Sequence, residues 1–111
     1  MIIYVDVDET ICETPDDRNY SLAIPWFDNI KKVNTLYDAG HTIVYWTARG
    51  SGSGIDWRKI TEDQFKLWGV KHHELNFGKP VYDVFIDDKN FNTDSFFQAS
   101  AEQLIEALKE E

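Results

Sequence analysis

The chain has 111 residues and is 42% hydrophobic and 14% aromatic, so we expect one compact domain covering residues 1-111. Its formal net charge of −9 disfavours nucleic acid as a partner, because an acidic surface repels phosphate backbones. The single cysteine, Cys12, excludes an internal disulfide and indicates a reducing compartment, and no apolar run is long enough to span a membrane. We therefore expect a soluble, cytoplasmic protein that does not associate with membranes.

The first expected element is a buried strand formed by the β-branched and aromatic residues between Ile2 and Val7. The acids Asp6 and Asp8 come at its end, with Thr10 just after them. Carboxylates two residues apart lie on the same face of an extended chain and repel each other, so a cation beside them would be stabilising. The alternative is a solvated, Asp-rich turn.

A polar loop, with room for a short hairpin, is expected from Glu13 to Ile24. Pro25 then suits the first turn of a helix, and Gly40 suits its end. The apolar residues between them recur at helical spacing and predict the buried side of that helix: Phe27, Ile30, Val33, Leu36 and Tyr37.

A second strand is expected over residues 42–47, and the glycines and serines of residues 49–54 predict a loop after it. Asp56 can cap a helix that runs from Trp57 to Trp68 and ends at Gly69. The predicted inner side of this helix consists of Ile60, Gln64, Phe65, Leu67 and Trp68. A weak extended segment follows over residues 70–75.

A further strand is expected over residues 82–86, and Ser100 with Gln103 fits the start of a last helix. Alternating strands and helices predict a parallel sheet covered on both faces. Ligands of such sheets bind beyond the carboxyl ends of the strands. The polar residues at or just past three of these ends are Asp6 and Asp8, Thr47, and Asp87 and Asp88.

Four short motifs therefore occur in order: Asp6-Val7-Asp8-Glu9-Thr10, Thr47-Ala48-Arg49, Lys79-Pro80 and Asp87-Asp88. Together they resemble the motifs of the haloacid dehalogenase superfamily, over essentially the whole chain. The resemblance implies a Rossmann-like, three-layer α/β/α fold with a mainly parallel sheet. It also implies a magnesium-dependent phosphatase, here a small member without a cap domain.

By this resemblance, Asp6 is the nucleophile that forms an aspartyl-phosphate. Asp8 is the general acid that protonates the leaving group and then the base that activates water. Thr10 steadies this loop through its hydroxyl group. The second Asp is informative, because members of the superfamily without it tend not to be phosphatases.

Magnesium prefers hard oxygen ligands, which the resemblance assigns to Asp6, the backbone carbonyl of Asp8, and one acid of the late pair. Asp88 is favoured as the direct ligand, with Asp87 acting through water or a neighbouring hydrogen bond. The alternative is that Asp87 and Asp88 are only an acidic turn.

The phosphate is assigned to Thr47, through its hydroxyl and nearby N–H groups, and to Lys79, which pairs with both Asp6 and the phosphate. Arg49 directly follows the Thr47 site and is a further candidate to touch the substrate. The plain alternatives are that Thr47 forms a turn and that Lys79 is a solvated surface charge.

With only a short flap from Glu13 to Ile24, the site would be open, which suits a bulky substrate or closure by a second copy in a homo-oligomer. By analogy with small capless members, the expected substrate is a phosphorylated sugar, sugar nucleotide or small-alcohol phosphate of surface-polysaccharide biosynthesis. Glu9 occupies a position where many members have glycine. Glutamate is also found at this position in the branch of protein serine phosphatases, so a phosphoprotein substrate remains an alternative.

Three other interpretations stay open. A receiver-type signalling domain shares the size, acidity, magnesium and aspartyl-phosphate. In a receiver the acid pair comes first, then the phosphorylated Asp and then the lysine, whereas here Lys79 precedes the second acid pair and Thr47 comes too early. A protein that binds metal without catalysis would keep the same residues. A nucleic-acid end phosphatase belongs to the same superfamily, and the net charge of −9 disfavours it.

Overall fold

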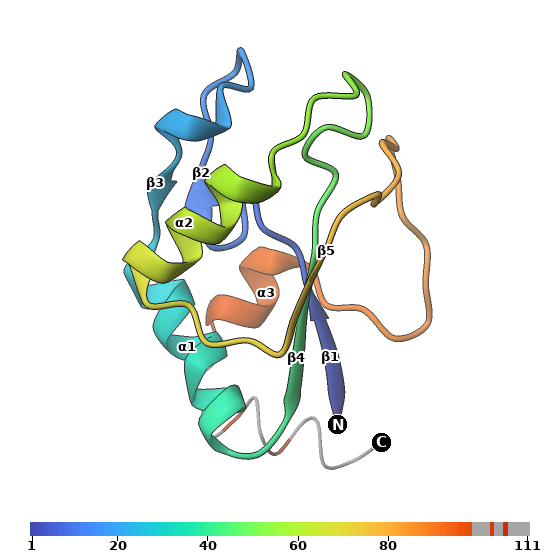
Figure 1. Cartoon of the computed structure of the whole chain (residues 1–111). Coiled ribbons are helices and arrows are strands. Elements are labelled where there is room, and N and C mark those ends of the chain that lie inside the picture. Colours follow the sequence, from blue (N-terminus) through green and yellow to red (C-terminus); the bar gives the residue numbers. More distant parts are fainter. Residues whose placement is uncertain (99–102, 104–105, 107–111) are drawn as a thin grey trace.

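A three-stranded parallel sheet lies at the centre of the computed structural model, which describes residues 1–98, 103 and 106 (Figure 1). The strands are β1 (Ile2–Val5), β4 (Thr42–Trp46) and β5 (Glu74–Asn76), in the order β1-β4-β5. Ile3 lies opposite Ile43, and Tyr45 lies opposite Leu75. The parallel sheet and the alternation of strands with helices confirm the predicted α/β class.

The connection from β1 to the first long helix contains the hairpin for which the sequence left room. Its strands are β2 (Cys12–Glu13) and β3 (Ile24–Pro25), which pair antiparallel. The short 3₁₀-helix η1 (Tyr20–Leu22) lies between them. Pro25 therefore belongs to a strand and not to the first turn of the helix. Residues 13–24 are called the flap below.

The two longer helices are α1 (Phe27–Asp38) and α2 (Arg58–Trp68). Helix α2 begins one residue later than predicted, so its N-cap residue is Trp57 and not Asp56. The Asp56 carboxylate still accepts a hydrogen bond from the Arg58 N–H at 3.0 Å. Gly69 ends α2 with a φ of +72°, a backbone conformation that glycine adopts without steric cost.

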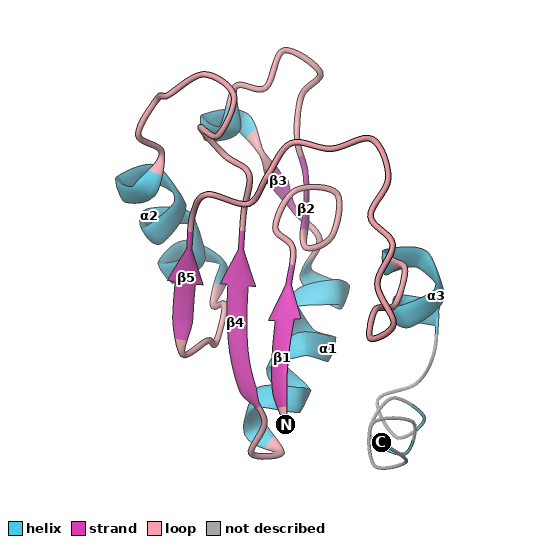
Figure 2. Ribbon diagram, turned by 90° about the vertical axis from the view of Figure 1, so that its right-hand side faces the viewer, coloured by secondary structure: helices cyan, strands magenta, loops and turns pink. Residues whose placement is uncertain are grey.

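The hydrophobic core fills the space between the sheet and these two helices. In Figure 2 both helices lie behind the sheet. The side chains at the centre of the core are Ile30, Val33 and Leu36 of α1, Ile43 and Tyr45 of β4, and Phe65 and Trp68 of α2. Phe27 and Leu67 were predicted for the inner sides of their helices but are exposed, because their positions turn away from the sheet.

Strand β1 is an edge strand and not the fully buried strand that its apolar composition predicted. Successive side chains of a strand point to opposite faces. Ile3 and Val5 pack against the core, whereas Ile2 and Tyr4 on the other face are exposed. Among the described residues, α1 and α2 therefore cover one face of the sheet.

The predicted strand over residues 82–86 is wrong, because this segment is irregular and its Val84 and Ile86 are exposed. It belongs to a long loop that runs outside the β1 edge and leads to an unpredicted short helix, α3 (Thr93–Gln98) (Figure 1). The predicted helix from Ser100, with Leu104, Ile105 and Leu108, lies almost entirely outside the described residues.

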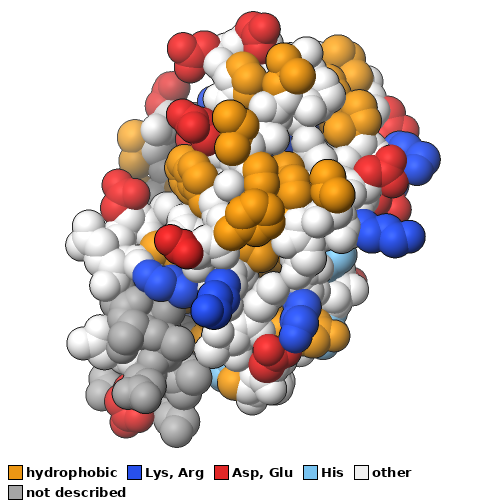
Figure 3. Space-filling model, turned by 90° about the vertical axis from the view of Figure 1, so that its left-hand side faces the viewer, with side chains coloured by type: hydrophobic (Ala, Val, Ile, Leu, Met, Phe, Trp, Pro, Cys, Tyr) orange, Lys and Arg blue, Asp and Glu red, His pale blue; other side chains and the backbone are white. Residues whose placement is uncertain are grey.

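Exposed hydrophobic side chains gather on the face shown in Figure 3. The elements on that side of the molecule contribute exposed Leu22 of η1, Ile24 of β3, Phe27 of α1 and Leu67 of α2. No helix in the described part of the chain is long and apolar enough to cross a membrane.

Candidate active site

The segments that follow the three parallel strands meet at one edge of the sheet. The Thr47 N–H donates a hydrogen bond to the Asn76 carbonyl at 2.9 Å, and the Lys79 N–H donates to the Thr47 carbonyl at 3.1 Å. These bonds connect the loop after β4 to the segment after β5. Because β1 runs parallel to β4, Asp6 and Asp8 arrive at the same edge.

Asp6 lies against the ammonium group of Lys79. Its Oδ1 accepts a hydrogen bond from the Val7 N–H at 2.8 Å, and its Oδ2 lies 3.5 Å from Lys79 Nζ. Burial raises the pKa of Asp6, Lys79 and the Val7 N–H act to lower it, and the nearby Asp8 raises it. The Asp6 side chain is still 41% exposed. Its carboxylate is therefore held by the protein and is also accessible to solvent.

Asp8 is held differently, by a guanidinium group that contacts both of its oxygens. Arg49 Nε lies 3.1 Å from Asp8 Oδ2, and Arg49 Nη2 lies 2.9 Å from Asp8 Oδ1. The Thr14 hydroxyl donates a further hydrogen bond to Oδ1 at 2.5 Å. Two parallel charge-assisted bonds fix the plane of a carboxylate as well as its position.

Arg49 itself is 2% exposed, and its remaining N–H groups are directed at protein atoms. Nη1 donates to Thr61 Oγ1 at 3.0 Å and to Gln64 Oε1 at 2.6 Å, and Nη2 also lies 3.7 Å from Cys12 Sγ. The sequence indicated Arg49 as a group that touches the substrate. In the structure it lies on the inner side of Asp8, toward α2.

The two threonines of the predicted site make backbone and loop contacts. Thr47 is fully buried, and its hydroxyl oxygen accepts a hydrogen bond from the Arg49 N–H at 3.1 Å, as in a turn-forming threonine. The Thr10 hydroxyl lies 2.9 Å from the Thr93 hydroxyl at the start of α3. Thr10 thus ties its loop to a helix that the sequence did not predict.

Glu9 supports the flap. It has a φ of +58°, an uncommon value for a residue with a side chain. Its Oε2 accepts a hydrogen bond from the Thr14 N–H at 2.9 Å, and its Oε1 pairs with Arg18 Nη1 at 2.7 Å. The side chain is therefore engaged by the flap, and Thr14, which also contacts Asp8, is a site residue that sequence analysis missed.

A hollow of about 700 Å³ lies between β1 and the loop that follows Lys79. Asp6, Thr10, Lys79 and Asp87 all line it. The aromatic side chains in its wall come from Tyr4, Trp46, Tyr82, Phe85, Phe91, Phe96 and Phe97. Asp88, which the sequence favoured over Asp87 as a metal ligand, is exposed and is not part of the described wall.

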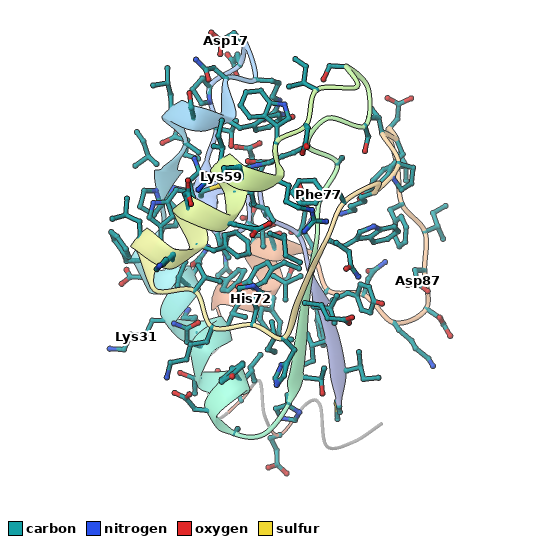
Figure 4. All side chains as sticks on the ribbon, in the orientation of Figure 1. Asp17, Lys31, Lys59, His72, Phe77 and Asp87 are labelled. Atoms are coloured by element: carbon teal, nitrogen blue, oxygen red, sulfur yellow. The ribbon has the colours of Figure 1, made fainter. Side chains whose placement is uncertain are left out.

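One acid of each pair lines the hollow, Asp6 and Asp87, whereas Asp8 and Asp88 are not part of its described wall. Figure 4 labels Asp87 on the loop that runs outside the sheet edge. In residues 1–98, 103 and 106, no group of three or more His, Cys, Asp or Glu side chains is placed to hold a metal ion. Asp6 and Asp87 both line the hollow, and carboxylate oxygens are of the hard type that suits Mg²⁺.

Comparison with known proteins supports the α/β fold of this chain. No protein-family model matches the chain, and no curated protein matches it. The chain is similar to the crystal structure of a target protein from Vibrio cholerae, with a TM-score of 0.79 and 24% sequence identity. The similarity covers 98% of this chain and 97% of that chain, so it shows that the same α/β architecture extends over nearly the whole length of both.

Proposed function

We propose that this chain is a magnesium-dependent phosphatase of the haloacid dehalogenase type that hydrolyses a phosphate monoester. The observation that carries the proposal is the contrast between its two neighbouring acids. Asp6 is accessible beside the Lys79 ammonium, and Asp8 is held on both oxygens by the buried Arg49. Two carboxylates in different environments can take different roles, one as nucleophile and one in proton transfer.

In the proposed reaction, an Asp6 oxygen attacks the phosphorus atom and the bond to the leaving oxygen breaks. The protonated carboxyl of Asp8 gives its proton to that oxygen, so an alcohol leaves. The Asp8 carboxylate then takes a proton from water, whose oxygen attacks the aspartyl-phosphate. The bond between phosphorus and Asp6 breaks, inorganic phosphate leaves, and Asp8 is again protonated.

The cations of the site would balance the phosphate charge. Lys79 pairs with Asp6 and is proposed to contact an oxygen of a bound phosphoryl group. The Thr47 side chain is fully buried, so it is not retained as a phosphate ligand. Bound Mg²⁺ would neutralise charge on the phosphoryl oxygens. The residues proposed to hold it are Asp6 and the Asp8 carbonyl, with Asp87, which lines the same hollow as Asp6, in place of the exposed Asp88.

The proposed substrate is a phosphorylated sugar, a sugar nucleotide or a small-alcohol phosphate, handled by a single cytoplasmic domain with a Rossmann-like three-layer fold. Support for this class comes from the hollow beside Asp6, whose aromatic lining offers flat apolar surfaces for a sugar or a base. A panel of such esters, with a phosphoserine peptide and a 3′-phosphorylated oligonucleotide as competitors, would rank the candidates by kcat/KM.

The test of the activity is turnover of p-nitrophenyl phosphate with Mg²⁺ by the wild type, Asp6→Asn and Asp8→Asn. We expect steady turnover that falls by at least ~100-fold in both variants, because Asp6→Asn removes the nucleophile and Asp8→Asn removes the base that activates water on the aspartyl-phosphate. The matched control is Asp63→Asn on α2, whose carboxylate pairs with Lys59 at the surface, and it should retain turnover within about twofold.

Two results would contradict the proposal. A wild type that labels itself once with phosphate and then stops would indicate a receiver-type domain. Normal turnover by Asp6→Asn would show that another group is the nucleophile.

A further inference from the structure

We propose that Arg49 is a positioning residue for Asp8, and that it links this acid to the flap through Gln64. The inference rests on the proposed function, in which Asp8 transfers protons. It differs from the role that the sequence indicated for Arg49, because it assigns the guanidinium to the protein and not to the substrate.

The first argument is the contact between the two side chains. Arg49 Nε and Nη2 reach the two oxygens of Asp8 at 3.1 and 2.9 Å, and the guanidinium is almost completely buried. The pair between Lys79 and Asp6 has a single contact of 3.5 Å and is far more exposed. A two-point contact fixes the orientation of the carboxylate, which in the proposed cycle takes a proton from water and gives it to the next leaving group.

The second argument is that the guanidinium has no donor left for a phosphate. A guanidinium has five N–H bonds. Those of Arg49 face Asp8 from Nε, Thr61 and Gln64 from Nη1, and Asp8 and Cys12 from Nη2. Its Cζ also lies 4.8 Å from the centre of the Tyr20 ring.

The third argument is the connection from Asp8 to the flap. Gln64 accepts a hydrogen bond from Arg49 with its Oε1 and donates from its Nε2 to the Tyr20 carbonyl at 2.6 Å. On the other side, the Thr14 hydroxyl donates to Asp8 directly. The flap thus contacts Asp8 at its first residues and Arg49 at η1, so the orientation of Asp8 depends on the order of the flap.

The experiment compares an aryl and an alkyl ester in Arg49→Met and Arg49→Lys. The p-nitrophenolate group leaves without needing a proton, whereas the alkoxide of glycerol 2-phosphate needs one. If Arg49 acts through Asp8, Arg49→Met should lower kcat/KM, which reports the step in which the leaving group departs, by ~100-fold or more for the alkyl ester. The loss for the aryl ester should be at least ~10-fold smaller. KM should stay within about threefold, and Arg49→Lys should recover part of kcat.

A double variant separates a positioning role from general support. The Asp8→Asn and Arg49→Met double variant should have the same kcat as Asp8→Asn alone, because the arginine then has no acid to position. The matched control is Arg58→Met, whose guanidinium lies over the Phe77 ring, and it should affect both esters equally and weakly. Gln64→Met, which removes both the acceptor for Arg49 Nη1 and the donor to the Tyr20 carbonyl, should show the same ester dependence in a milder form.

Two activity results would overturn the inference. A rise of ~30-fold in KM and in the inhibition constant of inorganic phosphate, with kcat unchanged, would show that Arg49 binds substrate. Equal losses of kcat/KM for both esters, with additive effects in the double variant, would show that it only supports the fold.

A spectroscopic measurement tests the pairing without any turnover. In ¹⁵N-edited spectra of the wild type, the Arg49 Nε–H signal should exchange slowly with water, and Asp8→Asn should shift it and speed its exchange. A signal that Asp8→Asn leaves unchanged would refute the pairing. Absence of wild-type turnover would instead refute the proposed phosphatase, so the two failures are distinguishable.

Discussion

Cys12 is a buried thiol that lies beside Asp8 and Arg49. Its Sγ lies 3.5 Å from Asp8 Oδ1 and 3.7 Å from the Val7 carbonyl oxygen, in the buried part of the chain. Burial raises the pKa of the Cys12 thiol to about 12, with the Asp8 charge acting in the same direction and Arg49 opposing it. The thiol is therefore protonated at neutral pH, and only the thiolate is reactive.

We predict that Cys12 in the folded protein does not react with Ellman's reagent at pH 8, and that it reacts fully in denaturant. The unfolded thiol ionises near pH ~8.5, below the pKa of the thiol in the folded protein. The free energy of unfolding should therefore fall as the pH rises from that value toward the folded-state pKa. The measurement is the absorbance of released thionitrobenzoate. As a control, Ser53→Cys in a Cys12→Ala background should react at once, because residue 53 is exposed.

The roles of individual residues were predictable only as far as spacing along the chain allows. Asp6, Asp8 and Thr47 could be placed at one sheet edge because the parallel strands β1 and β4 end together, whereas Lys79 was assigned only by the family resemblance. The direction of the Arg49 side chain depends on Thr61 and Gln64 of α2, which are 12 and 15 residues away in sequence. No local pattern contains that information.

At the level of elements, one face of helix α2 packs against the hydrophobic core and the opposite face is exposed to solvent. Phe65 is 1% exposed and packs edge to face on Tyr45 of β4, with ring centroids 4.9 Å apart. Leu67, two positions later on the same helix, is 82% exposed. The pair therefore offers two hydrophobic truncations in one helix that differ chiefly in burial.

We predict that Phe65→Ala lowers the free energy of unfolding by about 3–5 kcal/mol, since it removes transfer energy and leaves a cavity. Leu67→Ala should change it by no more than about 0.5 kcal/mol, because the side chain is already in water. Urea unfolding followed by circular dichroism measures both values. Equal losses in the two variants would mean that α2 does not pack on the sheet by the face described.

The elements were predictable where local pattern and packing agree. In β4, Ile43, Val44 and Tyr45 are β-branched or aromatic and are also buried between neighbouring strands. Residues 82–86 have a similar composition, but such composition only suits a half-buried pleated surface and does not supply a neighbouring strand. The Lys79 carbonyl instead accepts a hydrogen bond from Ser51, and the chain then runs outside the β1 edge.

For the molecule as a whole, the net charge of −9 means that any cation stabilises the folded chain to some extent by screening. A specific magnesium site would do more. It would bind the folded state and not the unfolded one, and would thereby shift the unfolding equilibrium. Asp6 and Asp87 line the same hollow, so Asp6 is the side chain whose removal should distinguish specific binding from screening.

We predict that Mg²⁺ at roughly ten times its dissociation constant stabilises the wild type by about 1.4 kcal/mol, or roughly 5 °C in Tm. Asp6→Asn should show only the smaller shift that potassium chloride of equal ionic strength produces, because screening does not depend on one carboxylate. Removal of the metal with EDTA should stop turnover of p-nitrophenyl phosphate, and added Mg²⁺ should restore it. The shifts of the wild type and of Asp6→Asn are measured by thermal unfolding, which does not require activity. An equal Mg²⁺ shift in both proteins would contradict the assignment of Asp6 as a ligand, and full turnover in EDTA would contradict the need for the metal.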